Sequence, residues 1–130
     1  MALTKRIKVG GSYYKGYKCT VGAGPGDHTL VIAPGRNGAI NSISVTPDGY
    51  GIGDTMSLKH YSDASATEDI LAILAEDIYN AGKGATVSLD LPAAEKVNSD
   101  ESLLFTYTNV AGVAMNVYII VEFVGIRKTS

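Results

Sequence analysis

The sequence predicts a mostly-β protein, an antiparallel sandwich of two sheets preceded by an extended N-terminal arm. Three observations support this. Apolar and polar residues alternate with a period of two in several short runs, as in half-buried strands. Clusters of glycine, proline, asparagine and aspartate separate these runs, and their close repetition is typical of a sandwich or barrel. The 130 residues are 45% apolar, which suffices for one core.

Residues 1–26 are predicted to be the arm and its hinge, and residues 27–130 the sandwich domain. The first segment carries five bases and no acid, whereas the second carries six bases and 13 acids. Gly-Ala-Gly-Pro-Gly at 22–26 is a clear break. This asymmetry indicates an arm that docks on an acidic partner, and the alternative is a basic edge strand that resists aggregation. The predicted contact residues are Lys5, Arg6, Lys8, Tyr13, Tyr14, Lys15, Tyr17 and Lys18.

Four runs after the hinge have the strand pattern, at 28–33, 39–46, 54–61 and 86–91. Pro-Gly closes the first run and Pro-Asp-Gly the second, and Pro92 is expected to end the fourth. The run at 54–61 shows the alternation most clearly, because Met56, Leu58 and His60 share one face.

Residues 65–82 fit two structures. Ser-Ala-Thr-Glu at 65–68 matches a helix capping box, and apolar residues then recur at helical spacing up to Gly82. If the segment is a strand instead, alternation places Ile70, Leu74 and Ile78 on the same face. The all-β context favours the strand, which gives seven strands, or eight if the arm contributes one.

The last two runs, 102–109 and 113–124, are predicted to form a hairpin with Asn109 opposite Val113. This register places Leu104 opposite Tyr118 on the outer face of the sheet. That face of the last strand is half apolar, which indicates a contact with another subunit. The predicted oligomer interface is Leu104, Tyr118 and Ile120; isolated exposed apolar residues are the alternative.

Residues able to carry chemistry are scattered along the sequence. His28, His60 and Cys19 lack the spacing of a zinc site, and His60 on an apolar face is typical of a satisfied core residue. The glycine-rich loops lack a P-loop signature, and the acidic doublets need not converge. A single cysteine allows no intrachain disulfide. We therefore expect no enzyme, cofactor or metal.

The start of the sequence lacks the apolar core of a signal peptide, and no apolar run approaches the ~20 residues that span a bilayer. We therefore expect a soluble product made in the host cytoplasm, without a membrane partner. The basic, tyrosine-containing arm could bind nucleic acid, but the chain has no recognised module for it, so no nucleic-acid partner is expected.

Three segments of the C-terminal half resemble segments of a known class of small proteins. They are Ala-Thr-Val-Ser-Leu-Asp-Leu-Pro at 85–92, Glu-Ser-Leu-Leu-Phe-Thr-Tyr-Thr-Asn at 101–109, and Val-Tyr-Ile-Ile-Val-Glu-Phe at 117–123. The sequence over 28–124 resembles the small β-sandwich proteins encoded beside major capsid proteins in tailed bacteriophage genomes. The resemblance is mainly compositional and does not cover the arm.

The resemblance implies a jelly-roll-like decoration, or cement, protein on the capsid surface of a virion. Such proteins typically form trimers and bind the major capsid protein, and no catalytic residue is carried over. The alternative function is a carbohydrate-binding module of a head or tail fibre, in which tyrosines such as Tyr50 stack on sugars. The absence of tryptophan counts against that alternative.

Overall fold

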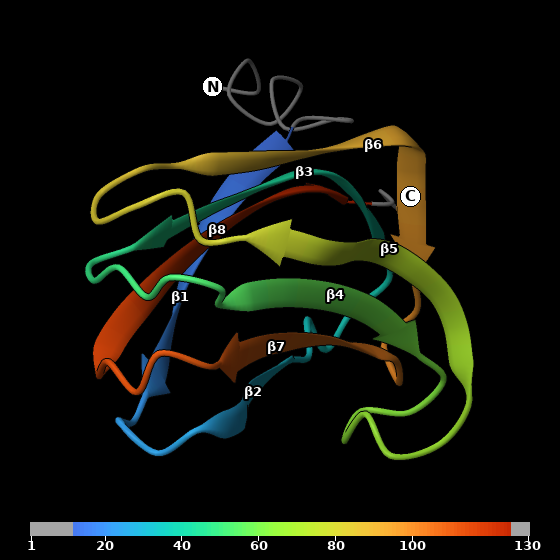
Figure 1. The fold of residues 1–130 in the computed structure, drawn as a ribbon. Helices are drawn as coiled ribbons and strands as arrows, with labels where there is room; N and C mark the ends of the chain where they lie inside the picture. Colours follow the sequence, from blue (N-terminus) through green and yellow to red (C-terminus); the bar gives the residue numbers. More distant parts are fainter. Residues whose placement is uncertain (1–11, 126–130) are drawn as a thin grey trace, which may run out of the picture.

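The computed structural model describes residues 12–125, which form two four-stranded antiparallel sheets packed face to face (Figure 1). The strands are β1 (Ser12–Val21), β2 (Gly26–Ile32), β3 (Gly38–Pro47), β4 (Thr55–Tyr61), β5 (Ile70–Tyr79), β6 (Val87–Val97), β7 (Ser102–Asn109) and β8 (Met115–Gly125). The first sheet has the order β1-β8-β3-β6, and the second has the order β2-β7-β4-β5. Residues 12–125 contain no helix long and apolar enough to cross a membrane.

The chain crosses between the sheets at almost every connection. Among the described strands, only β4 and β5 are both consecutive in sequence and hydrogen-bonded to each other. Eight strands in two interleaved sheets of this order make a jelly roll. The predicted fold class, a two-sheet antiparallel sandwich with jelly-roll character, is confirmed.

The core lies between the sheets and follows from strand alternation. In β4, buried and half-buried residues alternate from Thr55 to Tyr61, and β3 and β7 repeat this pattern along most of their length. Phe105 and Tyr107 of the second sheet and Val117 of the first are among the fully buried side chains. Period-two sequence patterns therefore place each apolar set on the inner face of its sheet.

The predicted β7–β8 hairpin is wrong. β7 pairs with β2 and β4, whereas β8 pairs with β1 and β3 in the other sheet. The connection crosses between the sheets: Asn109 Nδ2 donates to the carbonyl of Gly22, and the Asp54 carboxylate accepts from the backbone N–H of Val110 and of Ala111. The inward-facing residues of the two strands are buried but belong to opposite layers: Leu103, Phe105 and Tyr107 of β7, and Met115, Val117 and Ile119 of β8.

The ambiguous segment is strand β5, as the all-β context favoured. The Ser-Ala-Thr-Glu segment lies in the loop before it, where the acceptor is Asp63 and not Ser65: Asp63 Oδ1 accepts from the backbone N–H of Thr67 at 3.0 Å and of Glu68 at 2.9 Å. These bonds order a turn without starting a helix, because the following residues pair with β4 from Tyr61↔Ile70 to Thr55↔Tyr79. Tertiary pairing therefore overrides the local helix signal.

Most of the described part of the predicted arm is a strand of the sandwich itself. β1 is one of the two edge strands of the first sheet and pairs with β8 from Ser12↔Val124 to Val21↔Met115. Cys19 and Val21 are buried in the core. The predicted boundary at residue 26 thus does not separate β1 from the domain, and the alternative of a basic edge strand describes this part. Lys5, Arg6 and Lys8 lie outside the described residues.

Candidate interaction surfaces

Strand alternation divides the predicted contact residues of β1 between two faces. Tyr13 and Tyr17 point inward and are partly buried against the core, whereas Tyr14 and Lys18 lie on the outer face. Tyr14 is 68% exposed. Lys15 belongs to the inward set, yet it lies at the open end of the sandwich and is exposed. These tyrosines and lysines therefore do not form a single contact surface.

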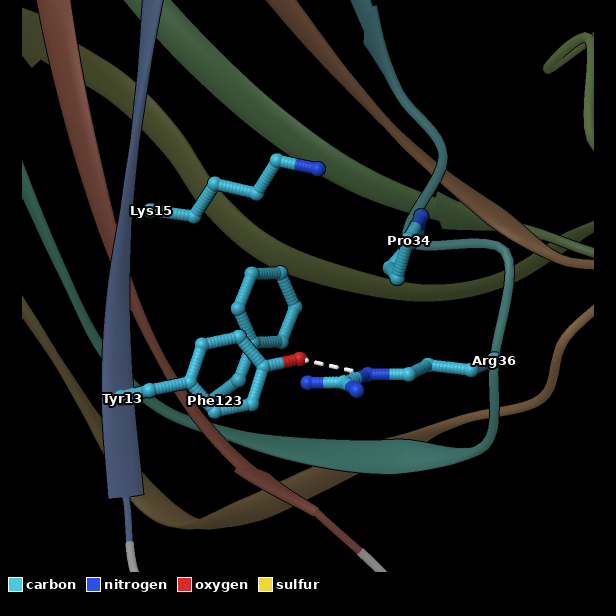
Figure 2. A pocket seen from close by; sticks show the side chains of 5 residues that line it. All are labelled: Tyr13, Lys15, Pro34, Arg36 and Phe123. Carbon is cyan, nitrogen blue, oxygen red and sulfur yellow. Dashed lines mark hydrogen bonds between the residues drawn. The ribbon is translucent and has the colours of Figure 1, made fainter.

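A cavity of about 260 Å³ opens at this end of the sandwich, and we call it the mouth pocket. Its lining residues are Tyr13, Lys15, Pro34, Arg36 and Phe123 (Figure 2). The Tyr13 ring stacks on Phe123 with centroids 5.5 Å apart, and the Arg36 guanidinium lies 4.4 Å from the Tyr13 centroid. Arg36 Nε also donates to the Tyr13 hydroxyl at 2.8 Å. The pocket thus brings β1, β8 and the β2–β3 loop together.

Two cations face the mouth pocket from opposite walls, Lys15 from β1 and Arg36 from the loop (Figure 2). Among residues 12–125 the ion pairs all involve His60, so neither cation is paired with a carboxylate there. Lys15 Nζ lies 5.6 Å from the centroid of the Tyr17 ring. Burial, and to a lesser degree Tyr13, raise the pKa of the Tyr17 hydroxyl, which keeps that ring neutral. The pocket is therefore positively charged.

The outer face of the first sheet presents Tyr118 and Ile120 of β8, 44% and 47% exposed. Ile120 pairs with Gly16 of β1 and Ser44 of β3, and neither neighbour covers it. Beside this apolar pair, Glu122 accepts hydrogen bonds from Ser42 at 3.0 Å and Tyr14 at 3.5 Å. The predicted exposure of an apolar pair on β8 is thus present in the structure.

Leu104 does not lie beside Tyr118 and Ile120. It pairs with Val31 of β2 and Lys59 of β4, on the outer face of the second sheet. The predicted three-residue seam therefore divides between opposite sides of the sandwich. The reason is the misassigned hairpin, since β7 and β8 belong to different sheets.

The outer face around Leu104 has further apolar residues that sequence reasoning missed. Ile73 of β5 pairs with Lys59, so Val31, Leu104, Lys59 and Ile73 form a row across the second sheet. Ile70 extends this surface, and Ile70 and Ile73 are 48% and 55% exposed. We call Val31, Leu104, Ile70 and Ile73 the second-sheet patch.

The signal for this patch was the composition of residues 70–75, which are all apolar. A strand that buries one face needs apolar side chains at alternate positions only. Strict alternation puts Ile70 and Ile73 on opposite faces. Register shifts between β4 and β5 instead place both on the outer face, opposite Tyr61 and Lys59.

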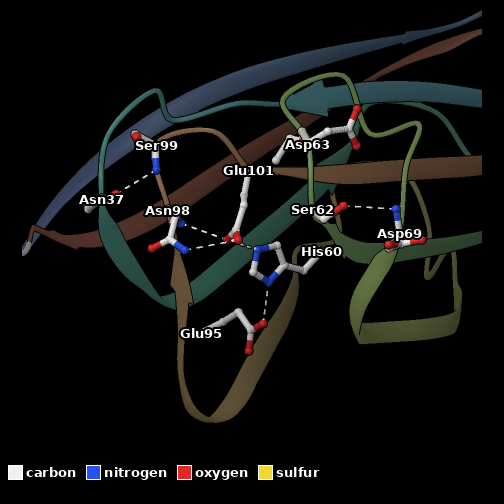
Figure 3. Close-up of polar contacts among 10 residues, drawn as sticks. Asn37, His60, Ser62, Asp63, Asp69, Glu95, Asn98, Ser99 and Glu101 are labelled. Carbon is white, nitrogen blue, oxygen red and sulfur yellow. Dashed lines mark hydrogen bonds and ion pairs between the residues drawn. The ribbon is translucent and has the colours of Figure 1, made fainter.

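His60 of β4 links the second sheet to the first through Glu95 of β6 (Figure 3). Its Nδ1 lies 2.6 Å from Glu95 Oε2 of β6, and its Nε2 lies 2.9 Å from Glu101 Oε1. Burial raises the pKa of Glu101, but hydrogen bonds from Asn98 and His60 outweigh burial and hold it below its usual value. His60 is thus a satisfied core residue, because both ring nitrogens are engaged.

The remaining candidate ligands are separated. His28 Nε2 contacts the carbonyl of Gly24 at 2.9 Å within a turn. Cys19 is buried in the first sheet, and burial raises the pKa of its thiol. Within residues 12–125, no three histidine, cysteine or acidic side chains are grouped to hold a metal ion.

Comparison with known proteins finds similar chains among solved structures only. No family model matches the sequence, and no curated protein matches it. Among solved structures, tomato aspermy virus has a TM-score of 0.47 at 12% identity, covering 92% of this chain and 80% of that one. The cyanophage Pam1 capsid asymmetric unit has a TM-score of 0.48 at 14% identity, covering 88% of this chain and 84% of that one. The Yersinia pseudotuberculosis-derived mitogen has a TM-score of 0.44 at 13% identity, covering 91% of each chain. These likenesses assign no function to this chain.

Proposed function

We propose that this protein is a structural protein of a bacteriophage virion, a decoration protein that binds the major capsid protein and strengthens the shell as an oligomer, a trimer in the simplest case. The observation that carries this proposal is the apolar surface on the outer faces of both sheets. A sandwich that stands alone in water presents polar outer faces, and clustered apolar side chains there indicate covering by other chains.

The two faces have different chemistry and suit different contacts. The second-sheet patch is a row of aliphatic side chains interrupted by Lys59. It suits contact with further copies of the same chain, because homo-oligomer interfaces are the more apolar class. The first sheet presents Tyr14, Tyr118 and Lys18 near its β1 edge, which suits an acidic, polar shell surface.

The oligomer contact is tested by a matched pair of substitutions, Ile73→Thr and Ile120→Thr. Each removes a half-exposed isoleucine from a strand, but on opposite faces. Light scattering across a concentration series should show the unaltered protein above its 13.6 kDa protomer mass. Ile73→Thr should lower the mass towards one protomer, and Ile120→Thr should leave it unchanged. If the unaltered protein remains monomeric at high concentration, the proposed oligomer is wrong.

The shell contact is tested by co-sedimentation of the protein with undecorated heads of the phage that encodes it. Lys18→Glu should weaken binding, because a like charge then faces the acidic shell. Lys83→Glu is the matched control, since Lys83 is also exposed but lies in the β5–β6 loop. Equal binding by the two variants contradicts a role for β1, and failure of the unaltered protein to sediment with heads contradicts the function.

A further inference from the structure

We propose that the mouth pocket is a carboxylate receptor, which takes the side chain of an aspartate or glutamate from the partner protein. The inference rests on the proposed function only for the identity of that partner. The pocket combines an arginine held in place, a second cation and an apolar wall, which are the elements that bind a carboxylate with an aliphatic stem.

Arg36 is oriented before any ligand binds. Phe123 is buried in the core with 3% exposure, Tyr13 stacks on Phe123, and the guanidinium lies over Tyr13. The bond from Arg36 Nε to the Tyr13 hydroxyl fixes the plane of the guanidinium and leaves its two terminal nitrogens available. A guanidinium in a fixed orientation binds a carboxylate with two parallel hydrogen bonds and loses little side-chain freedom on binding.

Lys15 supplies the second positive charge from the opposite wall (Figure 2). Within the described residues neither cation has a carboxylate at ion-pair distance, so an incoming acid does not have to displace one. Pro34 and Phe123 contribute apolar wall to the pocket. Both cations are exposed, so their attraction for an anion acts through solvent and weakens as salt is added.

The apolar wall favours an acidic side chain over a free phosphate. An aspartate or glutamate brings one or two methylene groups, which can lie against the half-buried Pro34, and its two oxygens match the edge of the guanidinium. Inorganic phosphate offers charge but no apolar part. A cavity of about 260 Å³ has room for a carboxylate together with its stem.

The experiment is an NMR titration of the ¹⁵N-labelled full chain with N-acetyl-glutamate N-methylamide, in which the side-chain carboxylate is the only charge. The expected result is a set of shifts confined to the start of β1 and residues 33–37, with a dissociation constant in the millimolar range, as a ligand of this size allows. The uncharged glutamine analogue should give no such shifts. Arg36→Gln should weaken binding roughly fivefold or more, and Lys83→Gln should not change it.

Several results would overturn the inference: equal shifts with the glutamine analogue, tighter binding of inorganic phosphate, no shifts at high millimolar ligand, or undiminished binding by Arg36→Gln. The proposed function fails separately. If Arg36→Gln sediments with phage heads as well as the unaltered protein does, the receptor is refuted and decoration stands. If the unaltered protein does not sediment with heads, decoration fails while the titration still measures the pocket.

Discussion

Asp54 is a buried carboxylate at the end of the sandwich where the β7–β8 connection crosses between the sheets. It accepts hydrogen bonds from the Tyr107 hydroxyl at 2.6 Å and from the backbone N–H of Val110 at 2.7 Å and of Ala111 at 3.0 Å. Burial raises the pKa of Asp54, but these three hydrogen bonds together outweigh burial and hold the pKa below its usual value. One charged side chain thus replaces the turn hydrogen bonds that a hairpin would have supplied.

Asp54→Asn should lower the free energy of unfolding at neutral pH by about 2–3 kcal/mol, because the amide replaces a charged acceptor of three hydrogen bonds. The lowered pKa gives stability that is present above the unfolded aspartate pKa of about 3.9 and is lost as the pH falls through the folded value. Urea unfolding at a series of pH values should therefore show the difference between the two proteins shrinking in acid. A difference that stays constant down to low pH would contradict this role.

Gly51 leaves the space that the Asp54 carboxylate occupies. A Cβ at position 51 would overlap Asp54 Oδ2, so Gly51→Ala should lower stability by about 1–3 kcal/mol. Gly16→Ala is the matched control, because a Cβ there meets nothing within 4 Å. Thermal unfolding should show a lower Tm for the first variant only. Equal Tm values would mean that the loop moves aside without loss.

At the scale of elements, alternation predicted the strands better than it predicted their partners. The runs at 28–33, 39–46, 54–61 and 86–91 correspond to β2, β3, β4 and β6. The β7–β8 hairpin failed because inward-facing residues show the same pattern whether the next strand lies beside them or across the core. Alternation of apolar and polar residues identifies the buried face of a strand, but it does not show which strand is hydrogen-bonded beside it.

Strand β6 extends past the proline that was expected to end it and runs to Val97. The register with β3 shows how, since Ser42 pairs with Asp90 and Ile40 pairs with Glu95. The intervening part of β6 has no partner in that ladder, and β6 is an edge strand, where a missing N–H is tolerated. Pairing between β6 and β3 begins again at Glu95, whose side chain contacts His60.

His60→Asn should loosen the attachment of β6 to the second sheet. The shorter side chain cannot serve both Glu95 and Glu101, so the loss should be about 2 kcal/mol. Hydrogen exchange should speed up at residues 95–97 while the amides of β8 keep their protection. His28→Gln is the control, because the His28 ring hydrogen-bonds to the carbonyl of Gly24 in a turn and does not join the two sheets. Uniform acceleration along the whole chain would contradict a local attachment.

At the scale of the molecule, the candidate surfaces were only partly predictable. Tyr118 and Ile120 were correctly expected on an outer face, because alternation in β8 is regular. Ile73 was missed because its position depends on register shifts that no local pattern reveals. The mouth pocket could not be predicted from the sequence. Arg36, Tyr13 and Phe123 are far apart along the chain, and the strand order brings them together.

Deleting residues 2–21 should unfold or aggregate the protein. The deletion removes the buried Cys19 and Val21 and exposes the edge of β8, at a cost on the order of 5 kcal/mol or more, comparable with the whole stability of a small domain. Deleting residues 2–11 should preserve cooperative unfolding, because every pair between β1 and β8 remains. Circular dichroism during heating distinguishes the two. A folded product of the longer deletion would mean that β1 is dispensable.

The pairing of β1 with β8 has a consequence for synthesis of the chain. The first described strand hydrogen-bonds to the last, so the ribosome must release the chain as far as β8 before the first sheet can close. Such high contact order slows folding and leaves apolar segments exposed during translation. A nascent chain of this protein should therefore bury its apolar strands later than a meander of sequential hairpins would.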